Sequence, residues 1–210
     1  MNRWKKASLI LALALFGSQG LVYAQTASQQ LRDFVRQVDA ATGQFSQRTI
    51  DTQGKPRPAQ TGEFAFKRPG QFKWQVIKPY EQLVLSDGKQ LYQYDPDLNQ
   101  LTQRGVGDAI GASPAAILFG SAQLDQSFDL TERPDAEGLK WLRAKPKAGD
   151  AGFEYMDIGF TGITPARLIL LDGFGQQTLI ELSNINTSVT LQPSDFSFTP
   201  PADVDVVTLP

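Results

Sequence analysis

The sequence contains no cysteine and no histidine among its 210 residues. Without these side chains the chain cannot form a Ser-His-Asp relay, a thiolate nucleophile, a histidine-bearing zinc site or a disulfide. Carboxylate chemistry and a Ser-Lys pair stay open in principle, but neither has a recognisable motif, and Ser86-Asp87-Gly88 is most simply a hairpin turn. We therefore expect a protein that is not an enzyme and that holds no metal or cofactor.

Long apolar stretches are also scarce. The apolar run at residues 7–16 spans about ten residues, whereas a membrane-spanning helix needs about 20. Three cations precede this run within the first six residues, and Val22-Tyr23-Ala24 follows it. This order predicts a cleavable secretory signal over residues 1–24 rather than a membrane anchor. With no cysteine behind the signal, the exported chain has no residue that could carry an acyl group of its own.

The exported chain, residues 25–210, has the length of a single domain with a sizeable core. Removal of Arg3, Lys5 and Lys6 lowers the number of positive groups from 20 to 17, against 22 negative groups. A modestly acidic surface argues against nucleic acid as a partner and against adsorption to anionic lipid headgroups. It is compatible with a soluble carrier or binding protein.

Apolar and polar residues alternate in four successive runs between residues 62 and 98, and turn residues such as Pro69-Gly70 and Asp87-Gly88 separate the runs. This pattern predicts an antiparallel meander with one apolar face. The apolar members are Phe64, Phe66, Phe72, Trp74, Val76, Leu83, Leu85 and Leu91.

Phe64, Phe66 and Arg68 are spaced two residues apart, so in a strand their side chains point to the same face. Arg68 therefore follows two apolar residues on that face and needs a partner for its charge. Two interpretations are open. Arg68 either lies at the rim of an ordinary sandwich core, or it pins a cover over a wide concavity lined by aromatic side chains.

Two segments have helical rather than strand periodicity. Ser28 can cap a helix that runs to about Ala41, with Leu31, Phe34, Val35 and Val38 on one stripe. Ser113-Pro114 can begin a short apolar helix that continues to Phe119 and ends at Gly120. The first helix either plugs the barrel permanently or belongs to a movable cover, and the short apolar helix is either buried under the sheet or lies over its concave face.

The second half returns to strand patterns at residues 128–131, 139–145, 153–160, 166–171 and 178–184. We interpret Trp141, Phe153 and Tyr155 mostly as ordinary core. The predicted fold is mainly β with some α: an incomplete, unclosed antiparallel β-barrel of about eleven strands, with a helical lid over a hydrophobic cavity that side chains do not fill.

An ordered series of short segments resembles one known family, the LolA-type periplasmic outer-membrane lipoprotein carriers. The resemblance runs from about Leu31 to about Val207. The segments are Phe66-Lys67-Arg68-Pro69-Gly70-Gln71-Phe72-Lys73-Trp74, Pro79-Tyr80-Glu81-Gln82, Ser86-Asp87-Gly88 and Tyr94-Asp95-Pro96-Asp97-Leu98-Asn99-Gln100.

This resemblance implies a chaperone of the Gram-negative periplasm. It would bind the acyl chains of lipoproteins released from the inner membrane and deliver them to an outer-membrane receptor. Its partners would be acylated lipoproteins, an inner-membrane ABC-type lipoprotein-releasing transporter and the outer-membrane lipoprotein receptor, and we expect it to act as a monomer.

The resemblance also implies roles for individual residues. Arg68 would lock the lid by hydrogen bonds to backbone carbonyls near Val35 and residues 115–119. Phe72 matches a family position associated with receiving cargo, Trp74 shares its face, and Phe64 and Phe66 are the next candidates for the acyl-chain cavity. The expected lid residues are Leu31, Val35, Val38, Ala115, Ala116, Ile117, Leu118 and Phe119.

Two alternatives stay open. A lipid-anchored outer-membrane acceptor would share the fold, but the missing cysteine argues against it. A periplasmic regulator that senses lipids or lipoproteins through a similar half-barrel belongs to a different functional class. Such regulators commonly add a second domain, for which residues 25–210 leave no room.

Overall fold

A computed structural model describes residues 25–106, 114–119, 124–149 and 151–209 of the chain. The predicted signal over residues 1–24 lies outside the described residues, as do the expected helix-flanking residues Ser113 and Gly120. None of the helices in the described ranges has the length and apolar content needed to cross a bilayer.

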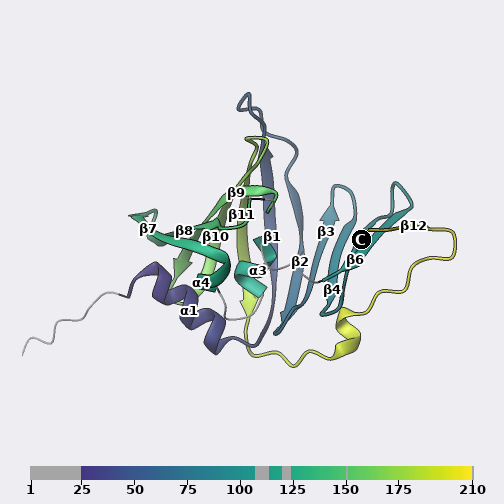
Figure 1. Ribbon diagram of the computed structural model, residues 1–210, viewed down its shortest axis with the longest axis horizontal. Helices are drawn as coiled ribbons and strands as arrows, with labels where there is room; N and C mark the ends of the chain where they lie inside the picture. The colour runs from purple at the N-terminus through teal and green to yellow at the C-terminus, as the bar shows by residue number, and fades with distance from the viewer. Residues whose placement is uncertain (1–24, 107–113, 120–123, 150, 210) are drawn as a thin grey trace, which may run out of the picture.

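One twelve-stranded sheet makes up most of the structure (Figure 1). The strands follow the order β12-β6-β5-β4-β3-β2-β1-β11-β10-β9-β8-β7, so the described sheet ends at β12 on one side and at β7 on the other. Neighbours are antiparallel except β12, which pairs in parallel with β6. The bounds are β1 Ala40–Ile50, β2 Gln60–Lys67, β3 Gln71–Lys78, β4 Gln82–Asp87, β5 Gln90–Asp95, β6 Gln100–Gly105, β7 Phe128–Ala136, β8 Leu139–Pro146, β9 Phe153–Thr161, β10 Thr164–Asp172, β11 Gln177–Asn186 and β12 Asp205–Thr208.

The prediction of a mainly β, unclosed antiparallel barrel is therefore confirmed, with one strand more than expected. The additional strand is β12, whose four residues were too few for the alternation to identify. It pairs with β6 only because the preceding segment carries the chain along the sheet, as Figure 1 shows.

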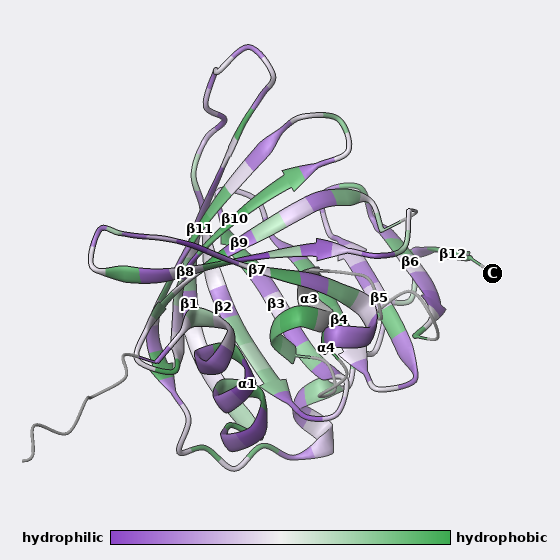
Figure 2. Cartoon of the chain, turned by 60° about the vertical axis from the view of Figure 1, so that its left-hand side comes forward, coloured by the Kyte–Doolittle hydropathy of each residue, from purple (hydrophilic) through white to green (hydrophobic). Residues whose placement is uncertain are grey.

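Three helices, α1, α3 and α4, lie over the concave face of the sheet, and Figure 2 shows them in front of the strands. On α1, Arg32 and Arg36 are exposed whereas Leu31 and Phe34 are buried, as expected for an amphipathic helix that covers a sheet. The described helices are α1 Ala27–Gln37, α3 Pro114–Phe119, α4 Leu124–Ser127 and the 3-10 helix η1 Pro193–Phe196.

The bounds of α1 differ from the prediction at both ends. Thr26, not Ser28, is the N-cap, because its side chain accepts a hydrogen bond from the Gln29 N–H. The helix ends at Gln37 rather than near Ala41, because the backbone of Val38 is extended and β1 begins two residues later. The apolar stripe was predicted correctly: Leu31, Phe34, Val35 and Val38 are all buried.

The prediction of one apolar face was wrong for β4. Trp74 pairs with Val84, which places Val84 on the concave face and its neighbours Leu83 and Leu85 on the opposite, convex face. Leu85 is 1% exposed there. The convex face is apolar because another part of the chain covers it.

That cover is the segment after β11, residues 187–204, which we call the C-terminal strap. It contains η1, which packs on β3 and β4 and carries the fully buried Phe196. Farther on, the Phe198 ring lies 5.1 Å from that of Tyr94. The sheet therefore has a second, smaller core on its convex side.

Candidate functional site

An apolar cavity of about 330 Å³ lies on the concave face between the two halves of the sheet. Strands β3 to β6 supply one wall, β1 and β9 to β11 supply the other, and α3 supplies part of the cover. Ten of the lining residues are apolar. The complete lining is Gln47, Phe72, Trp74, Val84, Leu91, Gln93, Arg104, Leu118, Phe119, Met156, Leu168, Leu170, Thr178 and Ile180.

The aromatic side chains of β1 to β3 form a continuous surface beside this cavity. The Trp74 ring stacks on Phe45 at 3.8 Å between centroids and lies 5.9 Å from Phe64. Cross-strand pairing explains the grouping, because Phe64 is opposite Trp74 and Phe66 is opposite Phe72.

Phe119 of α3 inserts into this aromatic surface. Its ring centroid lies 5.0 Å from that of Phe66, 5.9 Å from Phe72 and 6.1 Å from Phe64. Phe64 and Phe66 are therefore covered by the protein itself and do not line the cavity, whereas Phe72 and Trp74 do. Departure of α3 would remove the Phe119 ring from all three of these rings.

Two glycines allow the rings to lie close to the sheet. A Cβ atom at Gly43 would come within 2.5 Å of the Phe64 ring, and one at Gly62 would come within 2.6 Å of the Phe45 ring. At Gly62 the Cβ atom would also come within 2.0 Å of the Gln75 carbonyl oxygen on β3. Glycine at these two positions therefore permits a close approach of the rings and, at Gly62, of the neighbouring strand.

Arg68 joins the two main parts of the cover. Its Nε donates a hydrogen bond to the Val38 carbonyl at the end of α1, at 2.9 Å, and its Nη2 donates to the Leu118 carbonyl of α3, at 2.6 Å. The guanidinium also lies over the rings of Phe34 and Phe66, 5.4 and 5.0 Å from their centroids. One side chain thus holds α1, α3 and β2 together.

Burial lowers the pKa of Arg68 to about 10, although the charge of Asp39 acts in the opposite direction. Arginine therefore remains protonated at neutral pH in this position. If burial lowered the pKa of a lysine by the same amount from its usual value of about 10.4, the lysine would titrate at about pH 8. It would also lack the planar guanidinium whose N–H groups reach two carbonyls. The position favours arginine for both reasons.

The other end of α1 is held by the edge of the sheet. Glu132 of β7 accepts hydrogen bonds from the backbone N–H groups of Ala27 and Ser28, at 3.0 and 2.9 Å. Burial tends to raise the pKa of Glu132, but the hydrogen bonds from Ser28, Ala27 and Thr26 outweigh it, and the pKa lies below its ordinary value. A carboxylate at a helix N-terminus is also favoured by the helix dipole.

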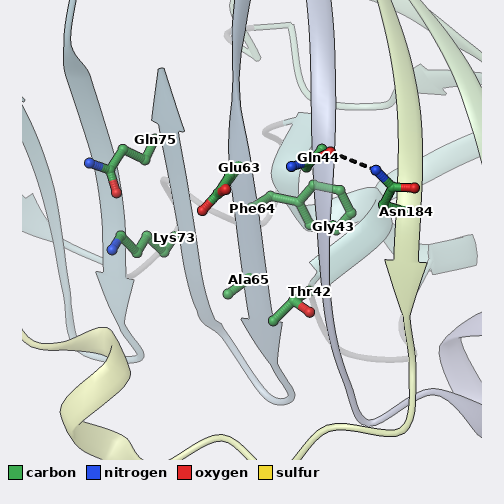
Figure 3. Close-up of a pocket in the computed structure, with 9 residues that line it drawn as sticks. All are labelled: Thr42, Gly43, Gln44, Glu63, Phe64, Ala65, Lys73, Gln75 and Asn184. Atoms are coloured by element: carbon green, nitrogen blue, oxygen red, sulfur yellow. Dashed lines mark hydrogen bonds between the residues drawn. The ribbon is translucent and has the colours of Figure 1, made fainter. Parts of the chain in front are cut away.

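A second, polar pocket of about 320 Å³ lies across β1 to β3 and β11. Its lining includes Gln44, whose side-chain oxygen accepts a hydrogen bond from Asn184 at 2.6 Å (Figure 3). Figure 3 also shows the Phe64 ring reaching towards Gly43. With Glu63 and Lys73 in its lining, the pocket is unsuited to an apolar ligand.

Comparison with known proteins decides the family. The family model described as "Outer membrane lipoprotein carrier protein LolA" matches residues 36–199. The chain is 55% identical over 202 residues to the outer-membrane lipoprotein carrier protein of Bordetella avium, covering 96% of each chain. This chain belongs to the LolA family. The carrier protein of Dechloromonas aromatica is 41% identical over 198 residues, which cover 94% of this chain and 95% of that protein.

A solved structure shares the fold of this LolA-family chain at low sequence identity. An uncharacterised conserved protein from Thermus thermophilus superposes with a TM-score of 0.55 and 15% identity, covering 88% of this chain and all of that one. At this identity the likeness concerns the fold alone. The unclosed sheet is thus a scaffold that very different sequences can build.

Most of the lid residues predicted for this LolA-family chain lie against the concave face. Leu31 and Val35 of α1 and its C-cap Val38 are buried, as are Ile117, Leu118 and Phe119 of α3. The side chains of Ala115 and Ala116 lie outside the described part of the structure. The carbonyl that Arg68 reaches on α1 is that of Val38, one turn beyond Val35.

The wall from the second half of the chain was missed by the sequence interpretation. Met156, Leu168, Leu170 and Ile180 line the cavity, whereas Trp141, Phe153 and Tyr155 do not. The alternation of side chains along the strands indicates these residues, because Met156 pairs with Leu170 and Leu168 pairs with Ile180 on one face of the sheet. This wall consists of non-aromatic apolar side chains, in contrast to the aromatic wall of Phe72 and Trp74.

Proposed function

We infer that this protein is a periplasmic carrier that binds the acyl chains of lipoproteins released from the inner membrane and delivers them to an outer-membrane receptor. The observation that supports this most directly is the apolar cavity under helices that Arg68 holds down. The relatives named as outer-membrane lipoprotein carriers match the chain over nearly its full length.

The energetics of the cargo explain why a carrier is needed. Each methylene of an acyl chain left in water costs about 0.8 kcal/mol, so a lipoprotein with several fatty chains cannot cross an aqueous compartment unaided. The walls of Phe72, Trp74, Leu170 and Ile180 offer these chains an apolar surface in place of water.

The size of the cavity argues that loading requires movement of the cover. A volume of about 330 Å³ is at the lower end for a site that takes even one small molecule. Several acyl chains need more space, and the nearest space is that filled by Leu118 and Phe119. Cargo and α3 therefore compete for one apolar surface.

This competition would make the carrier's hold on its cargo weak. Acyl chains gain contacts with the cavity walls, but α3 loses its contacts with Phe64 and Phe66, and Arg68 loses at least one carbonyl partner. The difference between the two states sets the affinity. Such a carrier can pass its cargo to a tighter acceptor without an energy source.

We also propose which partners the protein has and that it catalyses no reaction. An inner-membrane ABC-type transporter would load the protein and an outer-membrane lipoprotein receptor would unload it, with the protein acting as a monomer and not as an enzyme. A lipid- or lipoprotein-sensing regulator is the less favoured alternative, because the full-length relatives carry the name of carriers.

Native mass spectrometry of the protein purified from the periplasm tests this function. Cells should overproduce one acylated lipoprotein together with this protein, and we expect a one-to-one complex that includes the acyl chains. The same lipoprotein without its acyl chains should not co-purify. Recovery of only the free protein, or equal recovery of the unacylated form, would contradict the proposal.

A further inference from the structure

The cavity has a charged end. Of the described residues that line it, Arg104 of β6 is the only charged one, and it lies on the wall farthest from Met156 of β9 in the order of the strands. Arg104 is exposed, and so is Gln93 of β5, whereas Met156 and Leu168 are 1% and 3% exposed. One end of the cavity is thus apolar and closed, and the other is polar and meets solvent.

The register of the strands brings the two polar side chains together. Arg104 pairs with Leu91, and Gln93 pairs with Thr102, so Arg104 and Gln93 are diagonal neighbours on the same face. Diagonal neighbours are about 7–8 Å apart at their Cα atoms, within reach of long side chains. A guanidinium and an amide can therefore donate hydrogen bonds to one group placed between them.

Arg104 is also available for a ligand. Among the described residues it forms neither a salt bridge nor a side-chain hydrogen bond, unlike Arg32, Arg143 and Arg167, which all pair with carboxylates. The remaining polar residues of the lining, Gln47 and Thr178, are neutral and lie on the opposite wall. The charge at the cavity rim is positive and has no counter-charge in the lining.

The proposed cargo does not require a positive charge at the rim of the cavity. An acyl chain buried among Trp74, Leu170 and Ile180 needs only apolar contact, which a guanidinium does not provide. A guanidinium does suit a carboxylate or a phosphate, to which it can donate two parallel hydrogen bonds. Charge and shape together match a molecule with one apolar chain and one anionic head.

We propose that the cavity also binds single-chain amphiphiles with an anionic head, a carboxylate or a phosphate, with the head at Arg104 and the chain against Trp74 and Leu170. One chain is also the occupant that a cavity of about 330 Å³ suits better than several. The inference rests on the proposed ability of this cavity to hold acyl chains, but it adds a second ligand class and a specificity-determining residue.

Isothermal titration calorimetry with purified protein tests the proposal. The probes are laurate, 1-dodecanol with the same chain length and no charge, and 1-lauroyl lysophosphatidate, each below the concentration at which it forms micelles. We expect laurate to bind about tenfold more tightly than dodecanol, since a hydrogen bond to a charged group is worth about that factor. Comparison of laurate with lysophosphatidate tells which anionic head the site prefers.

The variant Arg104→Gln should lose about tenfold in affinity for laurate and keep the affinity for dodecanol, which also shows that its cavity is intact. Arg48→Gln removes an exposed arginine from the opposite face of β1 and should change neither affinity. The affinity of the unaltered protein for laurate should fall with salt, because the rim is exposed. Equal binding of laurate by Arg104→Gln and by the unaltered protein, or no binding of any probe, would overturn the proposal.

Failure of this inference is distinguishable from failure of the carrier function. The lipoprotein complex is measured with the unaltered protein, whereas the role of Arg104 is measured with laurate, so the two results are independent. If laurate binds through Arg104 and no lipoprotein is ever retained, the carrier function is wrong and the amphiphile site stands. If lipoprotein is retained and Arg104→Gln does not change the affinity for laurate, the carrier function stands and the amphiphile site is wrong.

Discussion

Arg68 donates hydrogen bonds to carbonyls of two helices that are far apart in the chain, and this dual contact predicts how its loss changes transport. Arg68→Leu removes both bonds from the closed, empty state. Because hydrogen bonds to charged groups contribute about 1.5–3 kcal/mol each, the closed state should weaken and the cargo should bind at least about tenfold more tightly.

We therefore expect Arg68→Leu to load lipoprotein normally and to release it slowly to the outer-membrane receptor. The measurement is the rate of transfer from the purified loaded carrier to the receptor. Arg48→Leu, on the exposed convex side of β1, is the matched control and should transfer at the normal rate. Transfer by Arg68→Leu at the normal rate would show that the lock is not Arg68.

Phe72 lines the cavity and is 4% exposed, which makes it the residue whose change should stop loading. Phe72→Glu places a carboxylate where acyl chains would lie, and we expect at least a tenfold loss of lipoprotein binding with a cooperative unfolding transition retained. Phe174→Glu is the control, since Phe174 is 83% exposed on a turn. Complete unfolding of Phe72→Glu, seen by circular dichroism, would mean that the residue is plain core.

We expect a substitution at Gly43 to lower the stability of the fold for a geometric reason. A Cβ atom in Gly43→Ala would come within 2.5 Å of the Phe64 ring, so the ring must shift, at a cost of about 1–3 kcal/mol. Gly105→Ala is the control, because a Cβ atom at that position of β6 meets nothing within 4 Å. Urea unfolding should separate the two variants, and equal midpoints would contradict the packing explanation.

At the scale of elements, α1 is attached at both ends, and Glu132 makes the N-terminal attachment sensitive to pH. The pKa of Glu132 is lowered in the folded state, so its contribution is fully present above the ordinary carboxyl pKa of about 4.3 and is lost as the pH falls through the lowered value. We expect α1 to be protected at pH 7 and to loosen only below about pH 4.

The variant Glu132→Gln should loosen α1 at pH 7 already. Because Glu132 is exposed, the effect should be modest, an increase of roughly threefold in the hydrogen-exchange rates of the first turn of α1. Exchange in β3 should not change. Glu154→Gln removes a comparable exposed glutamate on β9 and should leave α1 untouched. Unchanged exchange in Glu132→Gln would show that the N-cap Thr26 suffices alone.

The elements also show how far the sequence can be interpreted. The alternation around Phe64, Phe66, Phe72 and Trp74 identified two strands and their common face, because that face is buried and the other is solvated. In β4 the run Leu83-Val84-Leu85 has no such contrast. One face of β4 lines the cavity and the other is covered by the C-terminal strap, so both faces carry apolar residues. The alternation of residue types therefore could not show which side chains lie on which face.

The same limit applies to contacts between distant segments. Glu132 reaches Ala27 across 105 residues, and no local pattern in either segment indicates the pairing. Arg68 was noticeable only because a charge on an apolar row needs a partner. A single charged residue in an apolar setting is therefore readable from sequence, whereas an ordinary exposed glutamate on an edge strand is not.

Over the whole molecule, we expect the two faces of the sheet to carry separate tasks. The concave face holds the cavity beneath α3, whereas the convex face of β4 to β6 is covered by the C-terminal strap, with Phe196 fully buried. A sheet that keeps one face loosely packed needs stability from elsewhere. The strap supplies it without touching the cavity, because η1 packs on the opposite side of β3 and β4.

Phe196→Ala tests this division. Removing a fully buried phenylalanine should lower the free energy of unfolding by about 3–5 kcal/mol. Lipoprotein binding at a temperature where the variant is still folded should stay within about twofold of normal, because the two cores share strands but not a face. Phe72→Glu should show the opposite pattern, with cargo lost and more stability kept. If Phe196→Ala loses cargo binding in proportion to its stability, the strap and the cavity form one cooperative structure, and the separation of tasks between the faces is wrong.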